Sequence, residues 1–124
     1  MEEHALQERR LQNIRKVDNL KHYNINITDE AYNDMDGIYD YIADTLLEPA
    51  TAAKQYDRIA DAILSLEEMP ERIRIMDSEP ARSKGLRPLF VDNYTVLFVI
   101  KADTVFVARV IYSASDIRKR LSKE

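Results

Sequence analysis

The sequence predicts an α+β fold, in which an N-terminal α-helical hairpin packs on a small, mainly antiparallel β-sheet. The expected order is β-α-α-β-β-β with short terminal helices. Two apolar runs, 94–101 and 104–112, are rich in β-branched and aromatic residues and flank a two-residue connector, which is typical of an antiparallel hairpin. Their near-continuous apolarity indicates central strands that are covered on both faces. Upstream, residues 31–46 and 52–66 repeat apolar side chains at helical spacing, which predicts the two helices.

The first strand and the first helix meet at Thr28. Residues 23–27 alternate between apolar and polar side chains, which predicts a half-buried strand. Thr28 suits the N-cap of a helix, and the two acidic residues after it suit the positive end of the helix dipole. We expect this helix to end near Glu48, because a proline disfavours helical geometry in the residue before it.

The second helix is predicted to begin at Pro49, which is well placed in a first turn, and to end at Pro70. A short connection between two amphipathic helices predicts an antiparallel helical hairpin. Residues 71–85 are expected to be irregular. Residues 86–91 form the next predicted strand, in which Pro88 is best tolerated at a sheet edge or at a bulge.

Size and composition narrow the possible functions. The 124 residues predict one globular domain at 22–124, preceded at 1–21 by a helical extension with a narrow amphipathic stripe. The chain has no cysteine, and His4 and His22 are its only histidines, so we expect neither a metal site nor thiol chemistry, and no cofactor. The longest apolar run, 96–100, is far too short to cross a membrane, so we expect no membrane partner. The absence of cysteine fits a reducing compartment, so we expect a cytoplasmic location.

The net charge of −4 hides a marked asymmetry along the chain. Residues 1–22 carry a net charge of +1, residues 23–71 carry −10, and residues 72–124 carry +5. A protein with this dipolar distribution can meet a polyanion with one face while the other face repels it. The alternative is that the acidic helices are simply solvated, and charge alone favours this second interpretation.

Four strings of residues stand in order along the chain. They are Ile27-Thr28-Asp29-Glu30-Ala31 with Ile38-Tyr39-Asp40-Tyr41-Ile42, the stretch from Ala60 to Met69-Pro70, Asp92-Asn93-Tyr94-Thr95-Val96-Leu97-Phe98, and Val107-Ala108-Arg109-Val110-Ile111-Tyr112 with Asp116-Ile117. In order and spacing they resemble the RelE/ParE superfamily of toxins from bacterial type II toxin–antitoxin pairs. The resemblance spans residues 23–121 and implies a RelE/ParE-like fold.

The chain departs from the pattern of the RNA-cleaving members at two places. Many of those members have an arginine where this chain has Thr95. Many also end the last strand with His followed by Gly-Arg-Arg, whereas this chain has Tyr112 followed by Ser-Ala-Ser. The long helical hairpin is more similar to the ParE branch, which is associated with inhibition of DNA gyrase.

The resemblance implies a toxin that arrests bacterial growth and leaves its mechanism open. One possibility is inhibition of DNA gyrase; the other is a metal-independent, ribosome-dependent cleavage of mRNA. A third is a degenerate member that is not toxic and only binds an antitoxin or regulates. The implied partners are a cognate antitoxin, with DNA gyrase or the ribosome and mRNA as the target, in a homodimer or a toxin–antitoxin hetero-oligomer.

An mRNA nuclease needs a group that transfers a proton and cations that stabilise the charged phosphorane. Without a histidine in position, Tyr112 is the candidate for proton transfer, and Arg109 and Arg118 are the candidate phosphate clamps. Tyr112 and Arg109 each have a structural alternative: Tyr112 would pack against the last helix, and Arg109 would pair with an acidic residue of a helix.

A second group of cations is a candidate for contacting the nucleic acid or another target. Arg82, Lys84 and Arg87 precede or begin the predicted edge strand, and Arg120 follows the last strand. A solvated loop is the simpler interpretation of the first three.

Overall fold

A computed structural model describes residues 21–115 of the chain. The predicted N-terminal helix and the predicted last helix, with Arg118 and Arg120, lie outside these residues. The helices and strands follow in the order β1 (Asn24–Ile27), α2 (Asp29–Asp40), a π-helical turn (Tyr41–Thr45), α3 (Pro49–Leu64), two 3₁₀ turns (Ser65–Glu67 and Pro70–Arg72), α4 (Ala81–Lys84), β2 (Arg87–Val91), β3 (Tyr94–Lys101) and β4 (Thr104–Tyr112). The predicted α+β order is confirmed, with α4 added to it.

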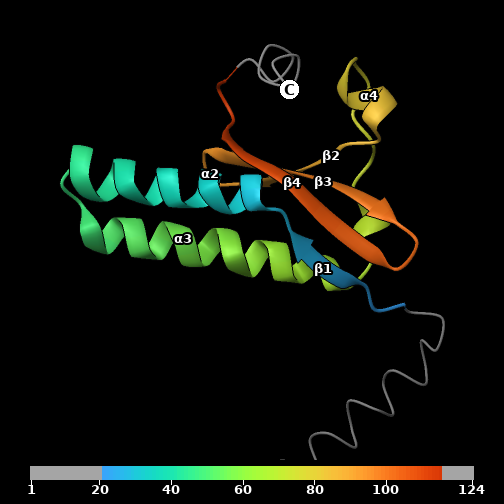
Figure 1. The fold of residues 1–124 in the computed structure, drawn as a ribbon, viewed down its shortest axis with the longest axis horizontal. Helices are drawn as coiled ribbons and strands as arrows, with labels where there is room; N and C mark the ends of the chain where they lie inside the picture. The colour runs from blue at the N-terminus through green and yellow to red at the C-terminus, as the bar shows by residue number, and fades with distance from the viewer. Residues whose placement is uncertain (1–20, 116–124) are drawn as a thin grey trace, which may run out of the picture.

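The four strands form one sheet in the order β1-β4-β3-β2 (Figure 1). β3 and β4 are its central, antiparallel strands and turn at Ala102-Asp103, as the sequence predicts. β1 pairs in parallel with β4, and β2 pairs antiparallel with β3. The sheet is therefore mainly antiparallel, and Pro88 lies in an edge strand.

The two long helices begin where the sequence predicts. The Thr28 hydroxyl caps α2 by accepting a hydrogen bond from the Ala31 N–H at 3.2 Å. Pro49 occupies the first turn of α3. The first helix does not continue regularly to Glu48, because the Leu46 N–H donates to the Tyr41 carbonyl, five residues back, and the α-helix gives way to a π-turn.

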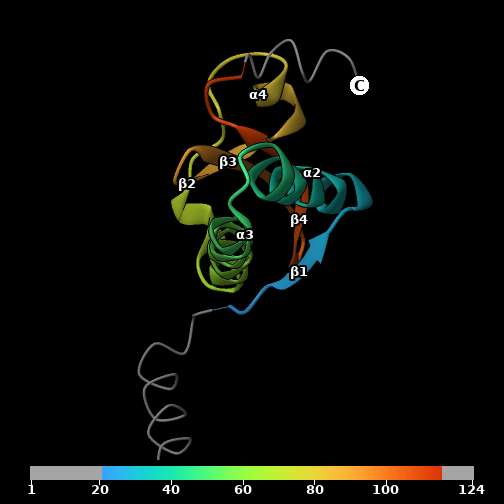
Figure 2. The same cartoon turned by 90° about the vertical axis from the view of Figure 1, so that its left-hand side faces the viewer.

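Helices and sheet pack in layers (Figures 1 and 2). α2 and α3 lie side by side on one face of the sheet and bury its larger core, whose fully buried members include Phe98, Ile59 and Ile63. α4 lies on the opposite face, where Ala81 and Leu86 join a second, smaller core. Both faces of the central strands are thus covered.

The short helix α4 is a correction to the sequence prediction, which left residues 71–85 irregular. Four residues are too few to produce a detectable helical periodicity. Gly85 ends α4 at φ 72°, a left-handed conformation that favours glycine. α4 and the residue that follows Gly85, Leu86, pack on the sheet and bury the second core.

Candidate functional site

A groove of about 780 Å³ opens between α2, the start of β3 and the end of β4. Its lining combines tyrosine rings, aliphatic side chains and amides. The lining residues are Asn33, Asp34, Gly37, Ile38, Tyr41, Leu46, Asn93, Tyr94, Val110, Ile111, Tyr112 and Ser115. Among the described residues that line the groove, there is no lysine, arginine or histidine.

The groove exists because β1 is shorter than β4. β1 pairs with β4 only as far as Val107, and a register shift in the β3–β4 ladder leaves Ala108 as an extra residue in β4. Beyond that point the start of α2 replaces the missing strand. The Thr28 hydroxyl donates to the Val107 carbonyl at 2.8 Å, and the Val110 N–H donates to Asp34 Oδ2 at 2.9 Å.

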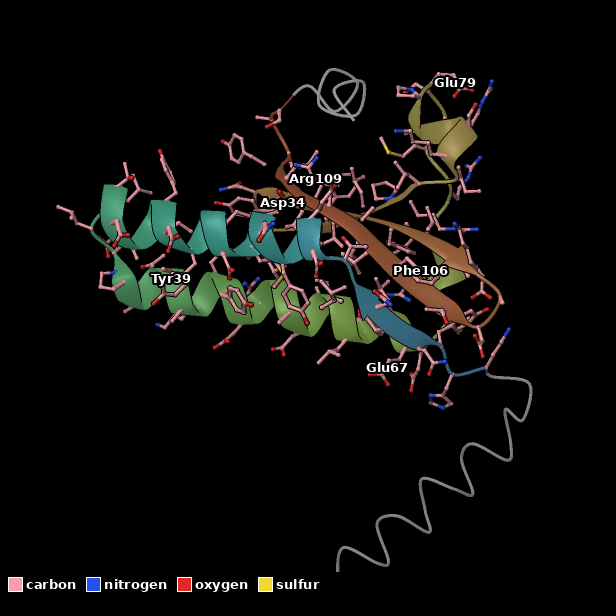
Figure 3. The ribbon with its side chains drawn as sticks, in the orientation of Figure 1. Asp34, Tyr39, Glu67, Glu79, Phe106 and Arg109 are labelled. Carbon is pink, nitrogen blue, oxygen red and sulfur yellow. The ribbon has the colours of Figure 1, made fainter. Side chains whose placement is uncertain are left out.

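Asp34 also holds the side chain of Arg109 (Figure 3). The Arg109 Nε–H donates to Asp34 Oδ2 at 2.7 Å and an Nη–H donates to Oδ1 at 3.1 Å, a two-point ion pair. Both side chains are largely buried, at 15% and 14% exposure. The carboxylate raises the pKa of Arg109, so the guanidinium stays charged and its charge is compensated within the fold.

The structure therefore places Arg109 in the second of its two predicted situations, paired with an acidic residue of a helix. Its role as a phosphate clamp remains a prediction. A guanidinium already bound at two points by a carboxylate has fewer donors left for a phosphate than one facing solvent.

Tyr112 lies at the end of β4 and is 52% exposed. Its ring meets that of Tyr94 edge to face, with the ring centroids 5.9 Å apart. Burial raises the pKa of Tyr94, and the neighbouring phenols of Tyr112 and Tyr41 add to the rise. The predicted contact of Tyr112 with the last helix lies outside the described residues, and its proton-transfer role remains a prediction.

The two places where the sequence departs from the RNA-cleaving pattern contact each other. Thr95 is fully buried, and its hydroxyl lies 2.8 Å from the hydroxyl of Ser113. The two side chains therefore form one small polar link between β3 and the turn after β4. In the sequence these two departures are 18 positions apart and look independent, although their hydroxyls form a hydrogen bond with each other.

The other predicted target-binding cations lie away from the groove lining. Arg82 and Lys84 are on α4, where Arg82 forms an ion pair with Glu79 at 3.0 Å. Arg87 begins β2 and donates to the Ile73 carbonyl at 2.7 Å. None of these three cations lines the groove that Tyr112 borders.

The sequence analysis missed the contribution of α2 to the groove. Asn33, Asp34 and Gly37 lie on the face of α2 that meets β4, and Tyr41 continues this face into the π-turn. One signal was present in the sequence: Gly37 is a glycine inside an otherwise regular helical pattern.

The described residues 21–115 contain no cluster of three or more histidine, cysteine, aspartate or glutamate side chains arranged to hold a metal ion. Within the same residues, no helix combines the length and the apolarity needed to span a membrane.

The described residues form a mixed four-stranded sheet with a helical hairpin on one face and a groove at the end of the last strand. This arrangement is that of an α+β protein of the RelE/ParE type. The family model described as the ParE toxin of type II toxin–antitoxin systems, parDE, matches residues 25–117. The chain belongs to this ParE toxin family, within the RelE/ParE superfamily. A comparison with curated proteins found no match.

This fold is also found in solved structures. A chain of the chromosomal ParDE toxin–antitoxin system from P. aeruginosa is similar with a TM-score of 0.62 and 23% identity, over 73% of this chain and 96% of that one. A chain of the RelBE2 toxin–antitoxin complex from Mycobacterium tuberculosis is similar with a TM-score of 0.51 and 22% identity, over 77% of this chain and 95% of that one.

Proposed function

We propose that this chain is the toxin of a type II toxin–antitoxin module and that it arrests growth by binding and inhibiting DNA gyrase. The observation that carries the choice of mechanism is the ion pair between Arg109 and Asp34. It compensates the charge of the arginine that a nuclease would direct at the scissile phosphate. Inhibition through a binding surface needs no such cation and no proton-transfer group.

The link between Thr95 and Ser113 supports the same choice. A buried threonine stands where many RNA-cleaving relatives have an arginine, and its hydroxyl is bonded within the fold. The described lining of the groove also supplies no cation for a phosphate. Residues 23–71, which include α2, carry a net charge of −10, and this charge opposes a polyanion.

The proposed module includes a cognate antitoxin that binds the chain and suppresses its toxicity. Support comes from the two structural neighbours, which belong to a ParDE system and to a RelBE2 toxin–antitoxin complex. The exposed apolar groups of the groove, among them Tyr41, Leu46 and Tyr112, suit a protein partner. A hetero-oligomer of toxin and antitoxin is the expected resting state, in the cytoplasm.

Induced expression in a bacterium, with pulse labelling of DNA and protein synthesis, tests the mechanism. We expect DNA synthesis to stop first, and the purified chain to inhibit supercoiling by purified gyrase. An early stop in translation with cut mRNA would instead establish the nuclease. Normal growth at a verified level of folded protein would indicate a degenerate, non-toxic member.

A pair of phenylalanine variants sharpens this test. Tyr112→Phe removes the only atom of Tyr112 that can transfer a proton and keeps its ring against Tyr94. We expect Tyr112→Phe to remain as toxic as the wild type, and Tyr39→Phe, on the helical hairpin and outside the groove lining, serves as the matched control. Loss of toxicity in Tyr112→Phe alone would favour the nuclease.

A further inference from the structure

The described part of the chain begins beside the turn that follows α3. His22 and Glu68 form an isolated antiparallel bridge, and the backbone N–H after His22 donates to the Glu67 carbonyl at 2.9 Å (Figure 3). Because the two segments run in opposite directions, the residue before His22 lies opposite the residue after Glu68, which is Met69. The attachment point of residues 1–20 therefore lies next to Met69.

Met69 holds an exposed apolar side chain at this point in a strained backbone conformation. Its φ and ψ are both 50°, in the left-handed region, and the residue is 53% exposed. The Arg72 guanidinium fixes this conformation by donating to the carbonyls of Glu68 and Met69 at 2.8 and 2.9 Å. Glycine or asparagine would adopt it more readily than methionine. Residues held in this region are concentrated at functional contacts, so the strain points to a use for the side chain.

The sequence of residues 1–20 fits this surface. Its apolar side chains recur near helical spacing and form one narrow stripe, made of Leu6, Leu11, Ile14, Val17 and Leu20. A narrow stripe suits packing on one small apolar surface. We propose that residues 1–20 pack, within the same molecule, on Met69 and on Leu64, the equally exposed last residue of α3. This inference goes beyond the proposed function and holds for either mechanism of toxicity.

Charge on the two sides is complementary. Residues 67–71 contain three exposed glutamates and no basic residue. The Tyr23 hydroxyl donates to the Glu71 carboxylate and lowers its pKa, so this charge persists at neutral pH. Residues 9–16 contain no acidic residue and four basic ones, Arg9, Arg10, Arg15 and Lys16. These cations flank the apolar stripe, where they can pair with the glutamates around Met69.

The covalent connection identifies residues 1–20 of the same molecule as the occupant. A short tether holds a segment at a local concentration on the order of millimolar, above that of a second copy in dilute solution. The family match begins at residue 25, so this segment lies outside it. Neither Leu64 nor Met69 lines the groove between α2, β3 and β4. The surface at the end of α3 is therefore paired with a segment that this chain adds to the family fold.

Limited digestion of the full-length chain with trypsin tests the contact, because Arg15 and Lys16 are cleavage sites within the segment. The test compares Met69→Asn with Leu47→Asn. Leu47 is a matched control, since it is 78% exposed, has φ 57° and lies before the opposite end of α3. Asparagine relieves the strain at both positions. We expect Met69→Asn to speed cleavage after Arg15 and Lys16 about tenfold, because cleavage follows the population of undocked segment. Leu47→Asn should keep the wild-type rate.

A pair of cysteines gives a second, geometric readout, because the chain has no cysteine of its own. Met69→Cys, which keeps a small apolar side chain, is combined with Val17→Cys or with Asn19→Cys. Val17 belongs to the stripe, and Asn19 lies on the opposite side of a helix. Asn19 is also closer to the attachment point, so tethering alone favours it. Under mild oxidation, followed by mass spectrometry, we expect the Val17 pair to form an intramolecular disulfide about ten times faster.

Three results would overturn the inference. A wild-type cleavage rate in Met69→Asn would show that this methionine does not hold the segment. Equal or faster disulfide formation by the Asn19 pair would indicate a tether without a packed stripe. Disulfides between molecules would make a second copy the occupant. Each of these results leaves the proposed function intact, since that function is tested by the arrest of DNA synthesis and the inhibition of gyrase.

Discussion

Asp34 stabilises the end of β4 at the place where β1 no longer reaches it. Its carboxylate accepts the backbone N–H of Val110 and also binds the guanidinium of Arg109. The sequence analysis identified Arg109 and named both of its alternatives. It could not choose between them, because the partner lies 75 positions away in the sequence and the extra residue in β4 re-aims the side chains after it.

Replacing Asp34 should therefore destabilise the fold. We expect Asp34→Ala to lower the free energy of unfolding by about 2–3 kcal/mol, since it removes a largely buried carboxylate that bonds to a cation and to a backbone donor. Urea denaturation followed by circular dichroism measures the change.

A double-mutant cycle with Arg109→Ala separates the ion pair from the backbone bond. We expect a coupling free energy of about 1 kcal/mol or more between Asp34 and Arg109. Asp34→Asn, which keeps an acceptor oxygen for Val110, should cost less than Asp34→Ala. Additive effects of the two alanine substitutions would contradict the importance of the pair.

At the scale of elements, both turns of the sheet contain a non-glycine residue in the left-handed conformation. Asp92 has φ 55° in the β2–β3 turn and Ala102 has φ 54° in the β3–β4 turn. Two-residue hairpin turns favour such conformations because their twist matches that of the strands. The length of the second turn was predictable from the two apolar runs, whereas the strained alanine was not, since asparagine and glycine are the usual residues there.

Ala102→Asn should relieve this strain. Asparagine adopts the left-handed region more readily than alanine does, so we expect the free energy of unfolding to rise by up to about 1 kcal/mol. Thermal melting of the two proteins under identical conditions measures the difference. An unchanged or lower melting temperature would show that the turn does not limit stability.

Asp92 makes the other turn sensitive to pH. Its carboxylate accepts hydrogen bonds from Arg58 at 2.7 and 2.8 Å and from Gln55 at 3.0 Å, which joins α3 to the turn. Arg58 and Gln55 lower the pKa of Asp92. The resulting stabilisation is complete above the ordinary aspartate pKa of about 4 and disappears as the pH falls through the lowered pKa.

We therefore expect Asp92→Asn to reduce stability at neutral pH and to lose less stability than the wild type on acidification. Asparagine tolerates the positive φ, so the turn itself is retained. Melting temperatures at neutral pH and at pH values below about 4 give the comparison. Parallel curves for the two proteins would rule out this carboxylate as a pH-dependent contributor.

The elements that the sequence analysis missed are those with weak local signals. In the π-turn the hydrogen bond spans five residues instead of the four of an α-helix, and α4 contains only four residues. The caps and prolines that began α2 and α3 are strong signals because each acts through its own backbone neighbours. Irregular helix ends instead depend on packing against the rest of the molecule.

At the scale of the whole molecule, β3 lies between the two cores. Phe98 belongs to the larger core beneath α2 and α3, and its neighbour Leu97 belongs to the smaller core beneath α4. The nearly continuous apolar run predicted that both faces of this strand are covered, but not which residue faces which core. The sheet order was not predicted either, because the parallel pairing of β1 with β4 joins segments about 80 residues apart.

Substitutions at these neighbouring positions should distinguish the two cores. We expect Phe98→Ala to lower the free energy of unfolding by about 3–5 kcal/mol and Leu97→Ala by about 2–5 kcal/mol, near the lower end because the second core is small. Denaturation measures both values. Hydrogen exchange should show that Leu97→Ala exposes mainly α4 and its flanks, whereas a uniform loss of protection would contradict two separable cores.

The edge of β2 has a consequence for the molecule in a crowded solution. Along an antiparallel ladder, hydrogen-bonded and non-hydrogen-bonded pairs alternate. Counting back from the hydrogen-bonded pair that closes the two-residue turn makes Pro88 and Leu97 a non-hydrogen-bonded pair, so the backbone nitrogen of Pro88 points away from β3, toward the outside of the sheet. Since proline has no N–H, a second molecule arriving at this edge finds a gap in the row of donors, and a continuous intermolecular ladder cannot form. The neighbouring Phe90 is 68% exposed and would otherwise favour such stacking. The absence of an N–H at Pro88 thus helps a protein with an exposed edge strand to resist the formation of fibrils.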